Sequence, residues 1–244
     1  MDTKLAVVTG AAGGLGRSIS QKLIDSGLTV VGLDIDAAGL DDAGEELGNG
    51  FVPKAIDLTD AGQVKNIFSQ IAVDHGGLGV LVNNAGTCFM SDFPNIPAVE
   101  FNKQMATNFS SAFHCCQAAI PVMLKQEGFK KIVNISSNGA YNFDVFDPPH
   151  YRASKAAMDT LTKDLARRYA RERITVNSIA PAMTETPLFG VLSEEVLQKA
   201  IDAMPHGRAM QASEIATWVD FLISPAGNIS SGNIIILNQG RDVR

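Results

Sequence analysis

Short, continuously apolar runs alternate along the chain with longer stretches that are apolar on one helical face only. The runs have the length and β-branched content of strands, and six of them lie at residues 5–8, 29–33, 80–82, 131–135, 174–176 and 234–237. A seventh strand is predicted at residues 50–56. Strands this apolar occur where helices cover both faces of a parallel sheet. The pattern therefore predicts an α/β fold with a doubly wound parallel sheet of about seven strands.

The stretches between the strands have helical periodicity. Leu15, Ile19 and Leu23 follow one another at four-residue steps, which puts one apolar stripe on a helix. This helix is predicted to run over about residues 14–26 and to end at Gly27.

The second half of the chain is predicted to hold a further amphipathic helix and a long excursion. Ala157, Leu161 and Leu165 fall on one helical face and are expected to point inward. Residues 182–210 are predicted to cross the sheet edge as a lid over a binding site. No repeat or linker interrupts the chain, so residues 1–244 are predicted to form one domain.

Composition and charge limit the possible partners. The chain has 244 residues, of which 45% are hydrophobic, so it can bury one large core. Its net charge of -6 leaves no basic stripe of the kind that binding to a phosphate backbone requires. No stretch approaches the roughly 20 apolar residues of a membrane-spanning helix. We therefore expect a cytoplasmic protein that binds neither nucleic acid nor membrane.

Cysteine and histidine do not form a metal-binding pattern. Cys88, Cys115 and Cys116 are odd in number, and a disulfide between the adjoining pair would be strained. The four histidines share no metal-ligand spacing with these cysteines. We expect reduced thiols and no catalytic metal.

A glycine-rich turn follows the first predicted strand. Residues 9–16 read TGAAGGLG and lead directly into the predicted helix. Such a turn brings bare backbone close to a pyrophosphate, and the helix N-terminus presents unpaired N–H groups and a positive dipole end. Glycine turns also occur without a ligand, but this position between strand and helix favours a Rossmann-type dinucleotide site. The residues expected at the pyrophosphate are Gly10, Gly13, Gly14, Leu15 and Gly16.

Asp34 ends the second predicted strand, 18 residues beyond Gly16. A carboxylate there can accept hydrogen bonds from the adenosine ribose and would repel an added 2′-phosphate. No basic residue occurs within the glycine turn, and Asp36 adds negative charge nearby. NAD is therefore predicted as the cofactor in preference to NADP. Two alternatives stay open, because Asp36 could be the ribose ligand and Arg17 could reach a phosphate.

Tyr151 and Lys155 lie four residues apart at the start of a predicted helix that follows Pro148 and Pro149. The spacing puts both side chains on one face, one turn apart. A phenol normally titrates near 10, and an ammonium within about 4 to 6 Å lowers that pKa. The pair is a candidate general acid/base, although a Tyr-x-x-x-Lys pattern is commonplace by itself.

Ser136 and Ser137 directly follow the strand predicted at residues 131–135. Ligands bind at this edge of open α/β sheets. A hydroxyl there can donate a hydrogen bond to a substrate oxygen that gains negative charge. The serines, the Tyr-Lys pair and the glycine turn together are stronger evidence for a catalytic site than any one of them alone.

Taken in order, these motifs resemble those of the short-chain dehydrogenase/reductase family. The resemblance runs from Lys4 to Gly240, and it rests on residues 9–16, Asp57, residues 83–86, Asn108, Ser137, Tyr151, Lys155 and residues 177–181. It implies a Rossmann-type fold, a homotetramer and an NAD-dependent oxidoreductase that interconverts a secondary alcohol and a ketone.

The resemblance also implies a role for each matching residue. Tyr151 would be the general acid/base, and Lys155 would lower its pKa and bind the nicotinamide ribose. Ser137 would polarise the carbonyl, with Ser136 as the alternative, and Asn108 would hold a water in a proton relay through Lys155. Further cofactor contacts are implied for Ile35, Asp57, Leu58, Asn84, Ala85, Gly86, Tyr151, Pro181, Ala182, Met183 and Thr186.

Apolar side chains near these motifs predict a mainly apolar, uncharged alcohol or ketone as the substrate. The candidates are Cys88, Phe89, Met90, Phe143, Phe146, Met183, Leu188 and Phe189, although core packing explains half of them equally well. His150, next to Tyr151, could contact the substrate, but it is expected to face solvent at the start of the helix. A 3-oxoacyl-(acyl-carrier-protein) reductase shares every motif, but it would ordinarily use NADPH and a basic patch for its carrier. The alternative to an enzyme is a non-catalytic sensor that binds the dinucleotide.

Overall fold

The structure is a computed structural model, which describes residues 4–142, 147–185 and 194–242. Seven parallel strands form one sheet in the order β3-β2-β1-β4-β5-β6-β7. The strands are β1 (Leu5–Thr9), β2 (Thr29–Asp34), β3 (Phe51–Ala55), β4 (Val80–Asn83), β5 (Lys130–Ile135), β6 (Ile174–Pro181) and β7 (Ile234–Leu237). The predicted sheet, including its strand within residues 50–56, is confirmed.

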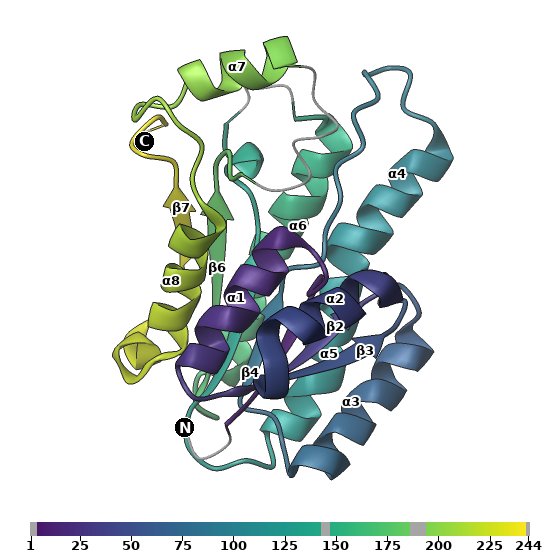
Figure 1. Cartoon of the computed structure of the whole chain (residues 1–244), viewed down its shortest axis with the longest axis vertical. Helices are drawn as coiled ribbons and strands as arrows, with labels where there is room; N and C mark the ends of the chain where they lie inside the picture. The colour runs from purple at the N-terminus through teal and green to yellow at the C-terminus, as the bar shows by residue number, and fades with distance from the viewer. Residues whose placement is uncertain (1–3, 143–146, 186–193, 243–244) are drawn as a thin grey trace.

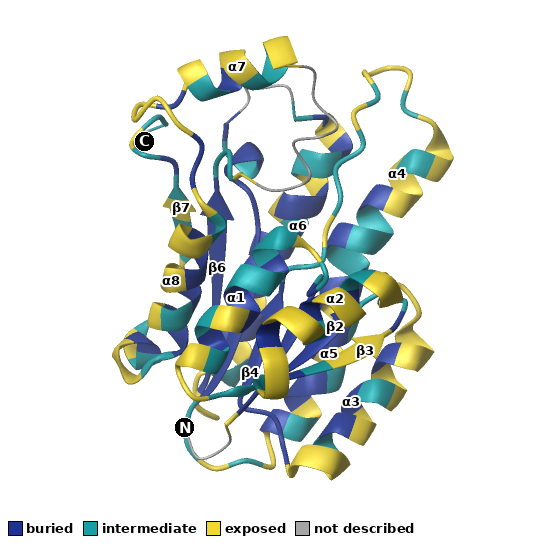
Figure 2. Cartoon of the chain, viewed as in Figure 1, coloured by how far each residue is buried: buried dark blue, intermediate teal, exposed yellow. Residues whose placement is uncertain are grey.

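Helices cover both faces of this sheet (Figure 1). They are α1 (Gly14–Asp25), α2 (Ala37–Leu47), α3 (Ala61–His75), α4 (Ala98–Met105), α5 (Ser111–Met123), α6 (Pro149–Tyr169), α7 (Glu194–Asp202) and α8 (Ala212–Ile223). One buried cluster joins one face to α3, α5 and α6, and a second joins the other face to α1, α2 and α8. Val7 belongs to the first cluster and Val8 to the second, as the two-residue period of a strand requires. The central strands are accordingly dark blue in Figure 2.

The first predicted helix is confirmed as α1. Ile19 and Leu23 are fully buried on its inner face. Gly27 follows the helix with a φ of 84°, the left-handed conformation that ends helices and that glycine adopts without a Cβ clash.

The inward face predicted for α6 is confirmed in part, because Leu165 is buried in the core, but the most buried positions of the helix are other residues. Met158 and Thr162 are fully buried, whereas Ala157 and Leu161 are only half-buried. The Thr162 hydroxyl accepts a 2.8 Å hydrogen bond from the side-chain amide of Asn134 in β5. A polar contact therefore occupies the middle of the helix–sheet interface, which an apolar pattern alone does not reveal.

The strand order reverses between β1 and β4, which is where open α/β sheets form ligand crevices. The Thr9 hydroxyl accepts hydrogen bonds from the backbone N–H groups of Asn84 (2.9 Å) and Ala85 (3.0 Å). The Asn84 side chain donates in return to the Thr9 carbonyl at 3.0 Å. These bonds hold the carboxyl ends of the two strands beside each other.

The described ranges contain neither a membrane-spanning helix nor a cluster of metal ligands. None of their helices combines the length and apolar character needed to cross a bilayer. No group of three or more His, Cys, Asp or Glu side chains in them is placed to hold a metal ion. Cys115 and Cys116 are buried free thiols.

Candidate active site

A cavity of about 410 Å³ opens at the carboxyl edge of the sheet. Its wall combines the β1–α1 turn, the ends of β5 and β6, the segment after β4 and the first turns of α6. The predicted cofactor residues in this wall are Gly10, Gly13, Gly14, Leu15, Gly16, Asp34, Asn84, Gly86, Tyr151, Lys155, Pro181, Ala182 and Met183. The predicted contacts Ile35, Asp57, Leu58 and Ala85 are not part of the wall. Thr186 lies outside the described residues.

The glycine turn presents backbone to the cavity. Gly10 has a φ of 66°, and a Cβ on Gly16 would lie 2.0 Å from the Gly10 carbonyl oxygen, so neither position tolerates a side chain without rearrangement. Gly13 is the N-cap of α1 and provides no side-chain hydrogen bond to the first turn. The first N–H groups of the helix are thus available to an anion.

Asp34 and Asp36 have different surroundings. The Asp34 carboxylate lies in the cavity wall, and it accepts hydrogen bonds from the backbone N–H of Ala12 (3.0 Å) and of Asp36 (3.1 Å). The Asp36 carboxylate caps α2 by accepting a 3.0 Å hydrogen bond from the Gly39 N–H. Of the two candidates for the ribose ligand, Asp34 is therefore the one at the cavity.

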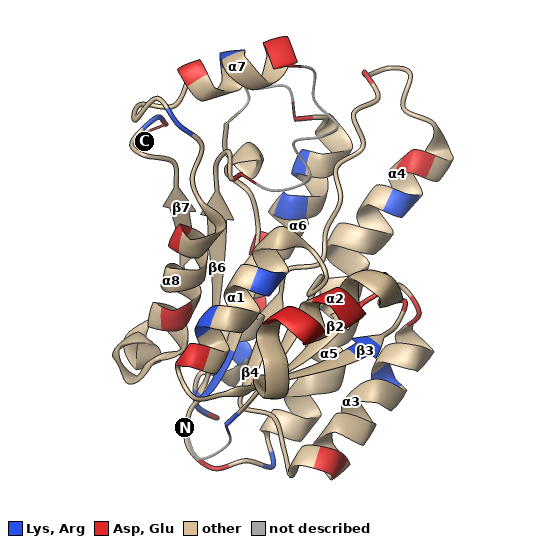
Figure 3. Ribbon diagram, viewed as in Figure 1, with Lys and Arg blue, Asp and Glu red and all other residues tan. Residues whose placement is uncertain are grey.

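Arg17 is held away from a ligand by three protein partners. Its Nε donates to the Ala12 carbonyl and one terminal nitrogen to the Gly39 carbonyl, both at 2.9 Å. The other terminal nitrogen pairs with Glu46 at 3.0 Å. Every charged residue of the neighbouring helix α2 is acidic (Figure 3). This end of the site has the charge that disfavours an additional phosphate.

Asp57 and Leu58 shape the turn after β3. The Asp57 carboxylate accepts hydrogen bonds from the Thr59 N–H (2.9 Å) and hydroxyl (2.7 Å). Leu58 is buried in the core cluster that contains β1 and α3. Ile35, by contrast, is 71% exposed. The resemblance implied cofactor contacts for all three residues, and none of them lines the cavity.

Tyr151 and Lys155 lie in the first turns of α6, which begins at Pro149 as the sequence predicts. Lys155 is buried, and its Nζ donates a 2.8 Å hydrogen bond to the carbonyl oxygen of Ile135 at the end of β5. The same nitrogen lies 6.0 Å from the centroid of the Tyr151 ring. The helix and the strand end thus bring a phenol and an amine to one wall of the cavity.

The expectation that Lys155 lowers the pKa of Tyr151 is not met in the protein alone. Burial raises the pKa of Tyr151 above its usual value, the negative charge of Asp147 raises it further, and a hydrogen bond with the Ser137 side chain lowers it only in part. Burial also lowers the pKa of Lys155 to about 8. Removing a charged group from water disfavours ionisation of both groups, and it is the largest cause of each pKa shift.

Ser136 and Ser137 point to different partners. The Ser137 hydroxyl accepts a 3.0 Å hydrogen bond from the Gly139 N–H, and its side chain also bonds with Tyr151. The Ser136 hydroxyl donates to the Lys155 carbonyl at 3.3 Å and lies beside the Asp159 carboxylate. Ser137 is therefore the serine beside the phenol.

Asn108 lies in a π-helical turn, η2 (Ala106–Ser110), between α4 and α5. It is fully buried, and its amide nitrogen donates to the Thr87 carbonyl (2.9 Å) and the Ser154 hydroxyl (3.1 Å). A Cβ on Gly86 would lie 3.4 Å from both the Asn108 Oδ1 and the Lys155 Nζ. Asn108 thus reaches the Lys155 side of the site from behind the cavity wall. The sequence pattern did not predict the π-helical turn, a feature frequent at functional sites.

The prediction that His150 faces solvent is wrong. Its side chain is 1% exposed, and its Nε2 lies 3.2 Å from Glu100 Oε1 in α4, at ion-pair distance but without hydrogen-bond geometry. The other Glu100 oxygen accepts a 2.7 Å hydrogen bond from Ser91. Burial of His150 results from the packing of α4 against α6, which joins residues far apart in sequence.

The substrate end of the cavity is only partly apolar. Of the predicted pocket residues, Cys88, Met90 and Met183 line it. Phe89 does not, and Phe143, Phe146, Leu188 and Phe189 lie outside the described residues. The wall also contains Asn138, Asp147 and Arg241, which the sequence motifs did not indicate. Two opposite charges therefore accompany the apolar surface.

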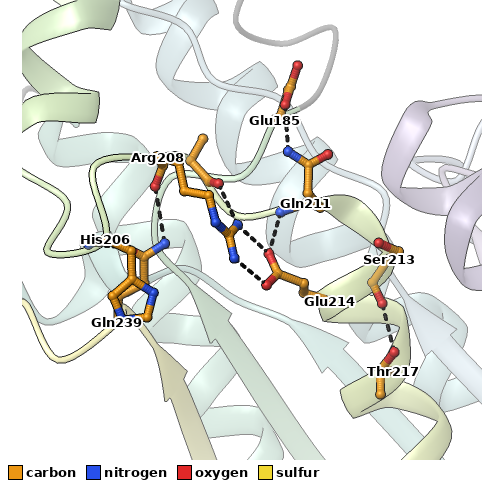
Figure 4. A network of polar contacts seen from close by, with 9 residues as sticks. Glu185, His206, Arg208, Gln211, Ser213, Glu214, Thr217 and Gln239 are labelled. Atoms are coloured by element: carbon orange, nitrogen blue, oxygen red, sulfur yellow. Dashed lines mark hydrogen bonds and ion pairs between the residues drawn. The ribbon is translucent and has the colours of Figure 1, made fainter.

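The predicted lid segment contributes to the cavity and is anchored at its far end. Ala200 of α7 lines the cavity. Beyond α7, Arg208 forms a two-pronged ion pair with Glu214 in the first turn of α8, at 2.7 and 2.8 Å (Figure 4). Gln211 donates a 2.7 Å hydrogen bond to Glu185, which ties the two ends of the segment together.

Comparisons with known proteins identify the family of the chain. Residues 4–197 match the family model described as short chain dehydrogenase. A 3α-hydroxysteroid dehydrogenase of Mediterraneibacter gnavus is 32% identical over 96% of this chain and 95% of its own length. A 3-oxoacyl-(acyl-carrier-protein) reductase of Staphylococcus aureus is 34% identical over 98% of both chains.

A solved structure gives the same result. The 3-ketoacyl-(acyl-carrier-protein) reductase of Brucella melitensis, complexed with NADH, superimposes with a TM-score of 0.92 and 25% identity, and the match covers 98% of both chains. Similarity of sequence and fold thus extends over nearly the whole length of the chain. The resemblance seen in the motifs is confirmed, and the chain belongs to the short-chain dehydrogenase/reductase family of oxidoreductases.

Proposed function

We propose that the protein is an NAD-dependent oxidoreductase that interconverts a secondary alcohol and a ketone. The observation that carries this proposal is the meeting of Ser137, Tyr151 and Lys155 in the wall of the cavity that the glycine turn also lines. A sensor would need the glycine turn to bind a dinucleotide. It would not need a half-buried phenol with a serine hydroxyl and a buried amine beside it.

The residues present suit NAD. The uncapped N-terminus of α1 offers N–H groups to a pyrophosphate, and Asp34 offers a carboxylate to the adenosine ribose. Arg17, the basic residue nearest to the turn, is engaged by two carbonyls and Glu46. Bound NAD would supply the acceptor for the hydride that leaves the carbinol carbon.

Tyr151 is assigned the proton transfer. In the reducing direction its neutral phenol donates a proton to the substrate oxygen while Ser137 donates a hydrogen bond to the same oxygen. In the oxidising direction the phenolate takes the proton of the alcohol. Because burial raises the pKa of Tyr151, the phenol stays protonated at neutral pH. Oxidation should therefore accelerate as the pH rises.

Lys155 and Asn108 are assigned supporting roles. We infer that the Lys155 ammonium holds the nicotinamide ribose, because its Nζ is fixed at the end of β5 beside Tyr151. Asn108 Oδ1 approaches Gly86 as closely as Lys155 Nζ does. Asn108 is therefore well placed to hold a water that returns protons to Lys155.

For the substrate we propose a mainly apolar, uncharged secondary alcohol or ketone. Cys88, Met90 and Met183 supply apolar surface at the substrate end of the cavity, and one relative is named a 3α-hydroxysteroid dehydrogenase. Reduction of a 3-oxoacyl-(acyl-carrier-protein) is the second candidate, since relatives of 34% and 30% identity are named for it. The acidic chain, with a net charge of -6, favours the first candidate because the carrier protein is itself acidic.

We further propose a cytoplasmic homotetramer in which residues 1–244 form one domain. Two separate surfaces expose large apolar side chains, as a tetramer with two kinds of interface requires. Phe101 and Phe113 lie on α4 and α5, and Trp218, Phe221 and Ile236 lie on α8 and β7.

The test of the catalytic assignment is Tyr151→Phe. This variant should bind NAD like the unaltered protein but lose turnover of secondary alcohols by about 10²-fold or more, because the proton acceptor is gone. NAD affinity is measured by fluorescence titration, and turnover by the appearance of reduced nicotinamide. Tyr169→Phe, near the other end of α6, is the matched control and should change neither quantity.

Three outcomes would contradict the proposal. Turnover retained by Tyr151→Phe would remove the phenol from the mechanism. Tight NAD binding with no turnover of any alcohol in the unaltered protein would favour the sensor. Reduction of a 3-oxoacyl carrier thioester with NADPH, in preference to any ketone with NADH, would favour the carrier-protein reductase.

A further inference from the structure

Asp147 places a carboxylate in the substrate end of the cavity, beside the proposed catalytic residues. It lies just before α6, and its backbone carbonyl accepts a 2.7 Å hydrogen bond from Arg152 Nε. Its side chain lines the cavity. Within residues 4–142, 147–185 and 194–242, no group donates a hydrogen bond to the carboxylate or pairs with it as a salt bridge. The main chain of Asp147 is therefore fixed, while its acceptor oxygens remain available to a ligand.

The carboxylate and the Ser137 hydroxyl both lie beside Gly139. A Cβ on Gly139 would lie 2.2 Å from Asp147 Oδ2 and 3.2 Å from Ser137 Oγ. The charge of Asp147 also raises the pKa of both Tyr151 and Cys88, so the carboxylate lies near each of them. A substrate whose reacting oxygen contacts Ser137 and Tyr151 would have its neighbouring atoms next to Asp147.

Asp147 is half-buried, and a partly desolvated carboxylate without protein donors gains when a ligand supplies one. Burial raises the pKa of Asp147, and the guanidinium groups of Arg152 and Arg241 lower it in part. These two cations would repel an amine, and the carboxylate itself would repel an anion. A neutral group that donates a hydrogen bond, such as a hydroxyl, suits this combination of charges.

We propose that Asp147 determines substrate specificity by accepting a hydrogen bond from a second hydroxyl of a neutral substrate, on a carbon next to the reacting one. The substrate class is then a vicinal diol in the oxidising direction and an α-hydroxy ketone in the reducing direction. This inference rests on the proposed function, and it adds a polar anchor to an otherwise apolar pocket. A simple alcohol leaves the carboxylate unsatisfied, so it should bind less well.

A matched pair of substrates tests the proposal. Butane-2,3-diol and butan-2-ol share a carbon skeleton and differ by the second hydroxyl only. The unaltered protein should turn over the diol with a kcat/KM at least about tenfold higher, as expected for a hydrogen bond to a charged group. Asp147→Leu should bring the ratio of the two kcat/KM values to about one, mainly through the KM of the diol, with NAD affinity unchanged. Asp147→Asn keeps one acceptor oxygen, so its ratio of the two kcat/KM values should lie between those of the unaltered protein and Asp147→Leu.

A control variant and a thermal melt separate recognition from folding. Asp164→Leu removes an exposed carboxylate of α6 and should leave the ratio as it is in the unaltered protein. Melting curves and NAD titration show whether each variant is folded, and Asp147→Asn retains the shape of the side chain should Asp147→Leu fail to fold. A preference for butan-2-ol in the unaltered protein, or an unchanged ratio in the folded Asp147 variants, would overturn the proposal.

Binding without turnover keeps this test independent of the catalytic proposal. In Tyr151→Phe loaded with NAD, calorimetry measures the affinity for the diol directly. Tighter binding of the diol than of butan-2-ol, lost when Asp147→Leu is added, supports the recognition role even if no alcohol is oxidised. Equal binding of the two alcohols, or binding of the diol that Asp147→Leu does not weaken, would overturn the recognition role while leaving the proposed function to its own test.

Discussion

The Nζ of Lys155 donates a 2.8 Å hydrogen bond to the carbonyl oxygen of Ile135, which joins the first turns of α6 to the end of β5. The bond fixes the amine beside Tyr151 before any ligand binds. The position has a cost in stability, because burial lowers the pKa of Lys155 from its usual 10.5 to about 8. Function and stability therefore make opposite demands on this residue.

Lys155→Met should stabilise the ligand-free protein and abolish turnover. The buried ammonium destabilises the fold below pH 8, and removing it should raise the free energy of unfolding by about 1–3 kcal/mol at pH 7. Between the pKa of about 8 in the folded protein and 10.5 in the unfolded chain, the unfolded chain binds more protons. The stability of the unaltered protein thus rises through this window. Urea unfolding at several pH values measures the difference in free energy of unfolding between Lys155→Met and the unaltered protein. This difference should shrink as the pH rises.

The matched control for this variant is Lys163→Met on the exposed side of α6. It should change neither stability nor its pH dependence. A Lys155→Met variant that is less stable than the unaltered protein at pH 7 would show that the hydrogen bond to Ile135 outweighs the burial of charge.

Ser137→Ala and Ser136→Ala should differ sharply in activity. Loss of the Ser137 hydroxyl removes a donor to the developing oxyanion, and kcat should fall by about 10²–10³-fold. The Ser136 hydroxyl donates to the Lys155 carbonyl and lies beside Asp159, so its removal should lower kcat by less than about tenfold. Steady-state kinetics at saturating NAD makes the comparison. A larger loss with Ser136→Ala would reverse the assignment.

Asp34→Asn should weaken the preference for NAD over NADP. The amide keeps an acceptor for the Ala12 N–H but loses the charge that repels a 2′-phosphate, so the ratio of NAD to NADP affinity should drop by about tenfold or more. Asp36→Ala is the comparison, because it removes the cap of α2 and should cost about 1 kcal/mol of stability without changing that ratio. Fluorescence titration with both dinucleotides gives the affinities. A shift in cofactor preference with Asp36→Ala alone would assign the ribose to Asp36.

Arg208→Met should raise the KM of the substrate several-fold and leave the KM of NAD unchanged. The ion pair with Glu214 anchors the segment that carries Ala200 to the cavity wall (Figure 4). Without this anchor, the substrate end of the site should be less well ordered. Arg168→Met removes the exposed ion pair with Asp164 on α6 and serves as the control. Equal effects on the two KM values would mean that Arg208 supports the whole fold.

Local sequence was enough to predict the parts of this protein that depend on neighbours along the chain. The apolar runs predicted the parallel sheet, and the four-residue steps of Leu15, Ile19 and Leu23 predicted α1. The glycine turn and the Tyr151–Lys155 pair are local as well, because the spacing of two residues on a helix sets which face they share. These features also identified the family.

Tertiary structure decided what depends on residues far apart in sequence. It separated Asp34 from Asp36, turned Ser137 toward Tyr151, buried His150 against Glu100, and brought Asp147 and Arg241 to one cavity. It also reversed the expected shift of the Tyr151 pKa, because burial is a property of the packed site. Periodicity reports which way a side chain faces on its own element. The burial of a side chain, its protonation state and its contacts are set only when separate elements pack together.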